Sequence, residues 1–331
     1  MKAIIPVAGL GTRLRPHTYS SPKPLLEVAG NTILGHILDE LVILGVDEVT
    51  FIVNYFGEDI EKWVKKNYSF RSNFVEQKEL RGLGHAISLA EPYHRDNEKI
   101  LIILGDTIFS ADLAKVLEWK ENALGVKAVE DPRRFGIVEL SNDTVTRLVE
   151  KPEIPPTNLA IVGIYHISQP FMLFDSLQEI IREGKTTRGE IQLTDALQRM
   201  LEKGAPFRTF EIDGWFDCGK FETMLETNRA LLDKNVTADC IKSLHKRFPG
   251  AVFNGPVIVG EGASISSSVI GPYVSIGSGT MVKDCIIRNS IISSSASISR
   301  AVLEDSLVGK EGRYQGSPLN LNIGDLCEVR S

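Results

Sequence analysis

Hydrophobic and polar positions follow two different patterns along this chain, and the change falls near residue 248. Before it, short β-branched runs alternate with stretches in which apolar residues recur at helical spacing. Residues 3–7, 48–53 and 100–104 are predicted strands, and residues 32–44 are predicted to form an amphipathic helix between the first two. Strands that alternate with helices in this order predict crossover connections and a mostly parallel sheet covered on both faces.

Beyond residue 248, the helical spacing gives way to a repeat of five or six residues in a background rich in Gly and Ser. A repeat of this type predicts a parallel β-helix of about three coils, with one aliphatic side chain per short strand pointing inward. A flexible Gly/Ser linker is the alternative, but ten aliphatic residues in register are too many for one. The repeating aliphatic positions are Val259, Ile265, Ile270, Ile276, Val282, Ile287, Ile292, Ile298, Leu303 and Val308.

Composition excludes several classes of protein. The 331 residues include 37 Lys and Arg against 43 Asp and Glu, a formal net charge of −6, which argues against a nucleic-acid partner. No apolar run approaches the roughly 18 residues of a membrane span. The four cysteines form no Cys-x-x-Cys pair, so neither a disulfide framework nor a zinc site is expected. We therefore expect a cytoplasmic protein with no membrane or nucleic-acid partner.

A glycine-rich loop follows the first predicted strand. Ligands of parallel sheets collect beyond the carboxyl ends of the strands. There the chain reads Ala8-Gly9-Leu10-Gly11-Thr12-Arg13, and Lys23 follows shortly after. Glycines let backbone N–H groups approach phosphate oxygens, and two cations beside them favour a polyphosphate. Position 14 is Leu14 and no Gly-Lys-Ser/Thr follows, so the loop is neither a dinucleotide fingerprint nor a P-loop. A tight strand-to-helix turn without a ligand is the alternative.

The segment Gly-x-Gly-Thr-Arg-Leu-x-Pro, followed by Ser-Pro-Lys-Pro-Leu, resembles the signature of the sugar-phosphate nucleotidylyltransferases, also called NDP-sugar pyrophosphorylases. The likeness continues in order to about residue 235 and is greatest to glucose-1-phosphate thymidylyltransferases that carry a C-terminal left-handed β-helix. It implies an α/β fold class: a Rossmann-like, mixed but mostly parallel sheet domain and a short left-handed parallel β-helix. We place the catalytic domain at residues 1–240, a linker at 241–250 and the β-helix domain at 251–331. The matching segments begin at Gln77, Gly82, Leu104, Phe135, Glu150, Gly163, Arg188 and Trp215.

The reaction that the resemblance implies is the attack of a sugar 1-phosphate oxygen on the α-phosphorus of an NTP, with pyrophosphate as the leaving group. Because both substrates are anions, Arg13 and Lys23 are the expected catalytic cations. The implied nucleotide-binding residues are Ala8, Gly9, Leu10, Gly11, Thr12, Arg13, Gln77, Gly82 and Asp106. The implied sugar-phosphate-binding residues are Gly136, Glu150, Lys151, Gly163 and Arg188.

Two carboxylates are expected to hold a metal ion. Asp106 follows the predicted strand 100–104, and Asp217 lies in a compact Trp-Phe-Asp-Cys-Gly turn. If the two side chains reach one point they can share Mg²⁺, which prefers oxygen ligands and substrate phosphates. The alternative for each residue is a helix N-cap, and one residue can serve both purposes.

The substrates we favour are dTTP and glucose 1-phosphate, with UTP second and GTP with mannose 1-phosphate third. A bifunctional enzyme with acyltransferase chemistry in the β-helix is disfavoured, because no histidine lies beyond His245. A non-catalytic sensor is disfavoured because Arg13, Lys23, Asp106 and Asp217 are all present. The flat sides of a β-helix commonly pair with another copy, so we also expect a homo-oligomer.

Overall fold

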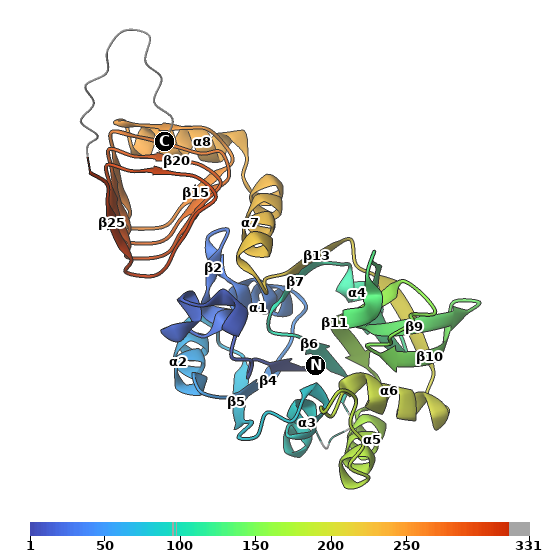
Figure 1. The fold of residues 1–331 in the computed structure, drawn as a ribbon. Coiled ribbons are helices and arrows are strands. Elements are labelled where there is room, and N and C mark those ends of the chain that lie inside the picture. Colours follow the sequence, from blue (N-terminus) through green and yellow to red (C-terminus); the bar gives the residue numbers. More distant parts are fainter. Residues whose placement is uncertain (95, 97, 318–331) are drawn as a thin grey trace. The chain divides into compact units, whose positions relative to one another are not determined.

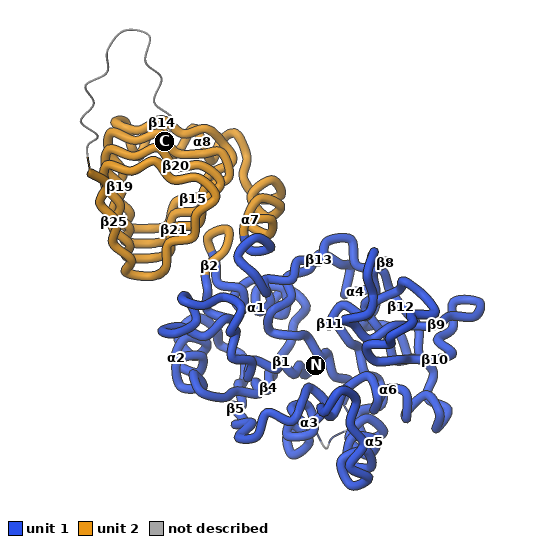
Figure 2. The backbone as a smooth tube through the Cα atoms, viewed as in Figure 1, with its two compact units in different colours: residues 1–26, 31–224 blue, residues 27–30, 225–331 orange. Residues whose placement is uncertain are grey.

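The computed structural model describes residues 1–94, 96 and 98–317, which form two compact units (Figures 1 and 2). The first unit comprises residues 1–26 and 31–224. The second comprises residues 27–30 and the described residues from 225 onward. The domain limits 1–240, 241–250 and 251–331 stay a prediction, and residues 318–331 of the last domain lie outside the described residues.

A nine-stranded sheet forms the centre of the first unit. Its main path runs β10-β9-β11-β6-β1-β4-β5, and β8 joins β11 and β12 beside it. The strands from β6 to β5 are parallel, whereas β11 runs antiparallel to β6. The expected mixed, mostly parallel α/β sheet is thereby confirmed. The strands are β1 (Lys2–Pro6), β4 (Glu48–Val53), β5 (Arg71–Glu76), β6 (Ile100–Ile103), β8 (Asn122–Ala128), β9 (Gly136–Ser141), β10 (Thr144–Glu150), β11 (Leu159–Ile167) and β12 (Phe207–Glu211).

Helices cover both faces of this sheet, and each face has its own apolar core. Side chains of α1, α2 and α4 contribute to one core, and those of α3, α5 and α6 to the other. The predicted helix 32–44 is confirmed as α1, whose N-cap Thr32 accepts a hydrogen bond from the Gly35 backbone N–H at 2.9 Å. Among the described residues no helix combines the length and the apolarity that a membrane crossing needs. The helices are α1 (Ile33–Ile43), α2 (Gly57–Asn67), α3 (Leu83–Ser88), α4 (Leu113–Leu117), α5 (Pro170–Arg182), α6 (Leu193–Glu202), α7 (Phe221–Asn235) and α8 (Ala238–Arg247).

The second unit contains the predicted β-helix. Twelve short strands form three sheets of four strands each, and every pairing within them is parallel. Their inward aliphatic side chains form a continuous core, in which Ile270 and Ile287 have no exposed surface. The strands are β14 (Ala251–Phe253), β15 (Val257–Val259), β16 (Ser264–Ser266), β17 (Ser268–Ile270), β18 (Val274–Ile276), β19 (Met281–Lys283), β20 (Ile286–Ile287), β21 (Ile291–Ile292), β22 (Ser297–Ser299), β23 (Val302–Leu303), β24 (Leu307–Val308) and β25 (Arg313–Gln315).

The β-helix differs from its prediction in the number of coils. Each sheet has four strands, so the described residues make four coils, where the repeat predicted about three. The first coil begins at β14, before the aliphatic series that starts at Val259, and it carries Phe253 at the inward position. Helix α8, which includes much of the predicted linker 241–250, packs Leu244 and Phe248 against this coil, and the rings of Phe248 and Phe253 are 5.9 Å apart.

Two histidines of the first unit are fully enclosed. His94 is 2% exposed and His166 has no exposed surface, and burial lowers the pKa of each from 6.5 to about 4. Neighbouring Lys2 and Lys99 lower the pKa values of His94 and His166 further, because they disfavour a second positive charge. Both imidazoles are therefore neutral in the folded protein at pH 7.

Because the folded pKa values lie below the unfolded ones, the stabilisation from these histidines is fully present above about pH 6.5 and is lost as the pH falls toward 4. We expect the free energy of unfolding, measured by urea denaturation, to decrease over this interval. His166→Leu should make the decrease shallower, whereas His245→Gln, at an exposed position, should not. An unchanged pH dependence in His166→Leu would contradict this assignment.

Candidate active site

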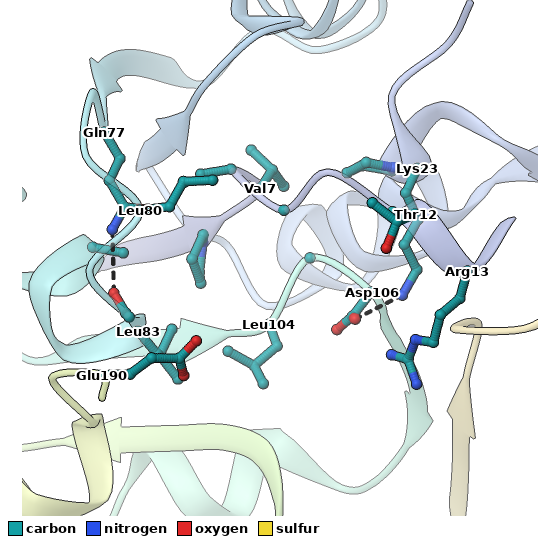
Figure 3. A pocket seen from close by; sticks show the side chains of 18 residues that line it. Val7, Thr12, Arg13, Lys23, Gln77, Leu80, Leu83, Leu104, Asp106 and Glu190 are labelled. Atoms are coloured by element: carbon teal, nitrogen blue, oxygen red, sulfur yellow. Dashed lines mark hydrogen bonds and ion pairs between the residues drawn. The ribbon is translucent and has the colours of Figure 1, made fainter. Parts of the chain in front are cut away.

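A cavity of about 470 Å³ opens at the carboxyl ends of β1 and β6 (Figure 3). These strands are parallel neighbours, with Lys2 opposite Ile100, so the loops that follow them emerge at the same edge of the sheet. Of the predicted nucleotide-binding residues, all but Leu10 line this cavity. Leu10 is 51% exposed and lines a smaller neighbouring cavity of about 210 Å³. The predicted residues in the lining are Ala8, Gly9, Gly11, Thr12, Arg13, Gln77, Gly82, Asp106 and Lys23.

The backbone of the glycine loop is held in a conformation that glycine favours. Gly11 has a φ of +60°, and the Thr18 hydroxyl donates a hydrogen bond of 2.9 Å to its carbonyl oxygen. Beside it, Gly105 packs so tightly on β1 that an added Cβ would lie 2.4 Å from Cγ1 of Val7. The absence of a side chain at Gly105 thus lets the loop bearing Asp106 lie directly on the first strand.

Lys23 joins the two predicted metal ligands. Its Nζ lies 2.7 Å from Oδ2 of Asp106 (Figure 3) and 4.0 Å from Oδ1 of Asp217, and its side chain is only 9% exposed. Asp217 arrives through strand β13 (Gly214–Asp217), which pairs antiparallel with β7 (Thr107–Ser110), directly after Asp106. A Cβ at Gly219 would lie 3.1 Å from Nη2 of Arg13 and 2.8 Å from Oδ1 of Asp217. Two cations and two carboxylates therefore meet at one point.

Gln77 occupies the opposite end of the cavity. Its side-chain nitrogen donates to the Gly82 carbonyl at 3.2 Å (Figure 3) and lies 3.2 Å from Nδ1 of His85. Burial lowers the pKa of His85, as does the charge of Arg81, which favours the neutral ring near pH 7. The amide is 3% exposed, and its partners fix its orientation. A planar donor and acceptor held in this way can select among flat polar ligands.

The predicted sugar-phosphate residues form a second cluster. Oε2 of Glu150 accepts a hydrogen bond of 2.6 Å from the Thr194 hydroxyl, and its Oε1 lies 3.3 Å from Nζ of Lys151. Arg188 donates to the Lys151 carbonyl at 3.0 Å. The Lys151 ammonium also lies 4.0 Å from Glu190, which lines the cavity. Glu190 thus links this cluster to the cavity that holds Arg13 and Lys23.

Two residues of this cluster have a strained backbone. Lys151 has a φ of +43° and Arg188 a φ of +55°, values that residues other than glycine rarely adopt. Such residues cost roughly 1–3 kcal/mol each and persist where their surroundings hold them in place. Because the Arg188 side chain bonds to the Lys151 carbonyl, the two strained residues are held against each other.

Gly136 and Gly163 make room for protein side chains. A Cβ at Gly136 would lie 2.6 Å from the Thr194 hydroxyl oxygen and 3.0 Å from Oε2 of Glu150. Gly163 has a φ of +83°, and a Cβ there would lie 2.7 Å from Cδ1 of Leu104. These contacts explain why a side chain does not fit at either position. That Gly136 and Gly163 also make room for a sugar ring stays a prediction.

Thr194 is a site residue to which sequence reasoning gave no role, and His85 is one that it interpreted as structural. Thr194 lies in α6, 44 positions from the Glu150 that it contacts, so no local pattern indicates it. His85 adjoins Gly84 in a segment already assigned to nucleotide binding, and this proximity is the one signal that could have suggested it. Leu80 and Leu83, which line the cavity near Gln77, were also not predicted (Figure 3).

Gly82 provides a test of the Gln77 end of the cavity. Its φ is +107°, and a Cβ would lie 2.6 Å from the Ile191 carbonyl oxygen, so Gly82→Ala must displace the loop that Gln77 contacts. We expect nucleotide affinity, measured by calorimetry, to fall about tenfold or more, equivalent to about 1.4 kcal/mol. Gly184→Ala is the matched control: its φ is +64° but nothing lies within 4 Å, so it adds backbone strain without a clash. Equal affinities in the two variants would contradict the role of this loop.

Comparison with known proteins agrees with the family resemblance seen in the sequence. Residues 2–234 match the sequence profile of the family described as Nucleotidyl transferase. The chain is 32% identical to the low-salt glycan biosynthesis nucleotidyltransferase Agl11 of Haloferax volcanii, over 94% of this chain and 92% of that protein. It is 30% identical to a glucose-1-phosphate thymidylyltransferase of Streptomyces antibioticus, again over 94% and 92%. The solved structure of a UDP-glucose pyrophosphorylase complexed with UDP-glucose is similar, with a TM-score of 0.62 and 26% identity over 71% of this chain and 99% of that one.

Proposed function

Because the chain belongs to the nucleotidyl transferase family, we propose that it transfers a nucleotidyl group from dTTP to glucose 1-phosphate and releases pyrophosphate. The observation that carries the proposal is the meeting of Lys23 with Asp106 and Asp217 at one edge of a cavity that also contains Arg13. Similarity to a thymidylyltransferase over nearly the whole chain supports the choice of substrates.

In this reaction the positive charges of the cavity offset the repulsion between two anionic substrates. An oxygen of the sugar phosphate forms a bond to the α-phosphorus, and the bond from that phosphorus to the oxygen bridging it to the β-phosphorus breaks. The Arg13 guanidinium binds the phosphates that leave, through its planar set of donors. Lys23, a point charge on a flexible stem, follows the negative charge that develops around the α-phosphorus.

The two ends of the substrate pair bind to different parts of the site. Gln77 and the Gly82 backbone read the donor and acceptor edge of a pyrimidine, a role that the small, planar amide supports. Lys151 binds the sugar phosphate, and Arg188 assists by holding the Lys151 carbonyl. Glu150 keeps the Lys151 ammonium in place and accepts hydrogen bonds from sugar hydroxyls.

Mg²⁺ is compatible with the donor set that the site offers. The described residues contain no group of three or more His, Cys, Asp or Glu side chains able to hold a metal ion. Asp106 and Asp217 supply two carboxylates at a point where a cation, the Lys23 ammonium, already binds. Mg²⁺ typically takes one or two carboxylates and completes its shell with substrate phosphates and water. When bound, it would neutralise phosphate charge and increase the electrophilicity of the phosphorus.

The carboxylates provide a direct test of this arrangement. Asp106→Asn and Asp217→Asn should each lower kcat by about 10²-fold or more, the scale seen when one electrostatic element of a transition state is lost. EDTA should abolish pyrophosphate release, and added Mg²⁺ should restore it. Asp213→Asn, at an exposed position in the turn before β13, is the control and should keep wild-type turnover. Near wild-type turnover in either of the first two variants would remove that residue from the site.

A pyrophosphate-release assay with each NTP against a panel of sugar 1-phosphates tests the substrate assignment. We expect the highest kcat/KM for dTTP with glucose 1-phosphate. UTP is the second candidate, since the fold is similar to that of a UDP-glucose pyrophosphorylase. The Bifunctional protein GlmU of Methanocaldococcus jannaschii is 38% identical, but the match covers 80% of this chain and 61% of that protein. Highest activity with GTP and mannose 1-phosphate would overturn the pyrimidine assignment. That the chain forms a homo-oligomer stays a prediction.

A further inference from the structure

Four residues near the N-terminus belong to the second unit and not to the unit that surrounds them in sequence. Residues 27–30 are grouped with the β-helix (Figure 2). Oε2 of Glu27 accepts a hydrogen bond of 2.9 Å from the Ser294 backbone N–H, and Oε1 accepts one of 2.5 Å from the Ser294 hydroxyl. A Cβ at Gly277 would lie 2.6 Å from the same carboxylate, so this corner of the β-helix has space for Glu27 only because a glycine lies there.

The tip of this turn is also enclosed. Ala29, with a φ of +48°, donates its backbone N–H to Oδ1 of Asn228 at 3.0 Å. Asn228 has no exposed surface; it also accepts from Ser275 at 2.6 Å and donates to the Tyr273 carbonyl at 3.2 Å. A buried amide with three partners, one in this turn and two in the β-helix segment 273–275, fixes the turn more firmly than a surface contact does.

Lys23 precedes Glu27 by four residues in sequence. Between them the chain forms the short 3₁₀ helix η3 (Lys23–Leu25), and the Leu26 backbone N–H donates to the Lys23 carbonyl at 3.1 Å. The Leu26 carbonyl in turn accepts from the Ile33 backbone N–H at 3.0 Å. Glu27, which follows Leu26, is the residue bound to Ser294. Any loosening of the turn formed by residues 27–30 is therefore transmitted through the backbone to the segment that carries Lys23.

We propose that Glu27 and Asn228 are positioning residues for Lys23, through which the β-helix holds the segment bearing the catalytic ammonium. Neither residue lines the cavity. They act by limiting the conformations of residues 23–26, so that Nζ of Lys23 stays where the α-phosphate is expected. Positioning to within a fraction of an ångström strongly affects transfer reactions. The effect on turnover rests on the proposed function, whereas the effect on residues 23–26 does not.

The test combines amide hydrogen exchange without substrates and steady-state kinetics on the full-length protein. In Glu27→Ala, exchange at the Leu26 and Ile33 amides should rise about tenfold or more, the scale of losing a charge-assisted hydrogen bond. Ser294→Ala, which removes one of the two bonds, should give a smaller rise. Ser297→Ala, in β22 of the same β-helix, is the matched control and should change neither amide.

Kinetics separate positioning from a purely structural role. In Glu27→Ala, kcat should fall about tenfold while KM for the sugar phosphate stays unchanged, and Glu27→Gln, which keeps an acceptor oxygen, should recover most of the loss. Unchanged exchange at Leu26 and Ile33 in Glu27→Ala, with the β-helix folded by circular dichroism, would overturn the proposal. If Glu27→Ala fails to fold, unchanged exchange in Ser294→Ala overturns it instead. Raised exchange with an unchanged kcat would overturn the link to Lys23.

A wild-type protein inactive with every substrate pair would count against the proposed function, and the exchange data would still decide whether the turn is held.

Discussion

The parallel pairing of β1 with β4 on one side and β6 on the other is the constraint on which the site depends. Lys2 lies opposite Glu48 and Ile100 in the two pairings, so all three strands end at the same edge. The glycine loop after β1 and Asp106 after β6 are brought together by this register alone. The antiparallel pairing of β7 with β13 then adds Asp217 to the same point. The site is assembled from strand ends together with the long connection that follows β1, which carries Arg13 and Lys23.

The elements with local signals could be predicted from the sequence. β-branched runs predicted the strands at 48–53 and 100–104, and apolar spacing predicted α1. The end of the cavity formed by the glycine loop was predictable because its glycines and cations are close in sequence. The aliphatic series missed the first and last strands, β14 and β25, because aromatic residues, Phe253 and Tyr314, take the aligned positions there.

Long-range contacts could not be read from the sequence in the same way. The bond from Thr194 to Glu150 and the approach of Asp217 to Lys23 depend on sheet register and helix packing, which no window of residues encodes. The strained backbone at Lys151 and Arg188 could not be predicted from the sequence either, because neither Lys nor Arg favours a positive φ. Resemblance to a family indicated that these residues matter, but the contacts that hold them appear only in the fold.

The ammonium of Lys23 has a consequence for the order in which ligands enter. A divalent cation that reached Asp106 and Asp217 alone would meet a positive charge 2.7 Å from one of them, at a side chain that is 9% exposed to screening solvent. A cation that arrives together with the nucleotide is accompanied by negatively charged phosphates, and the Lys23 ammonium can turn toward these phosphates. If Mg²⁺ binds there as proposed, metal and nucleotide would raise each other's affinity by the same factor, as thermodynamic linkage requires. Lys23 would then act as an internal counter-ion that keeps the carboxylates from capturing a free metal ion before the nucleotide arrives.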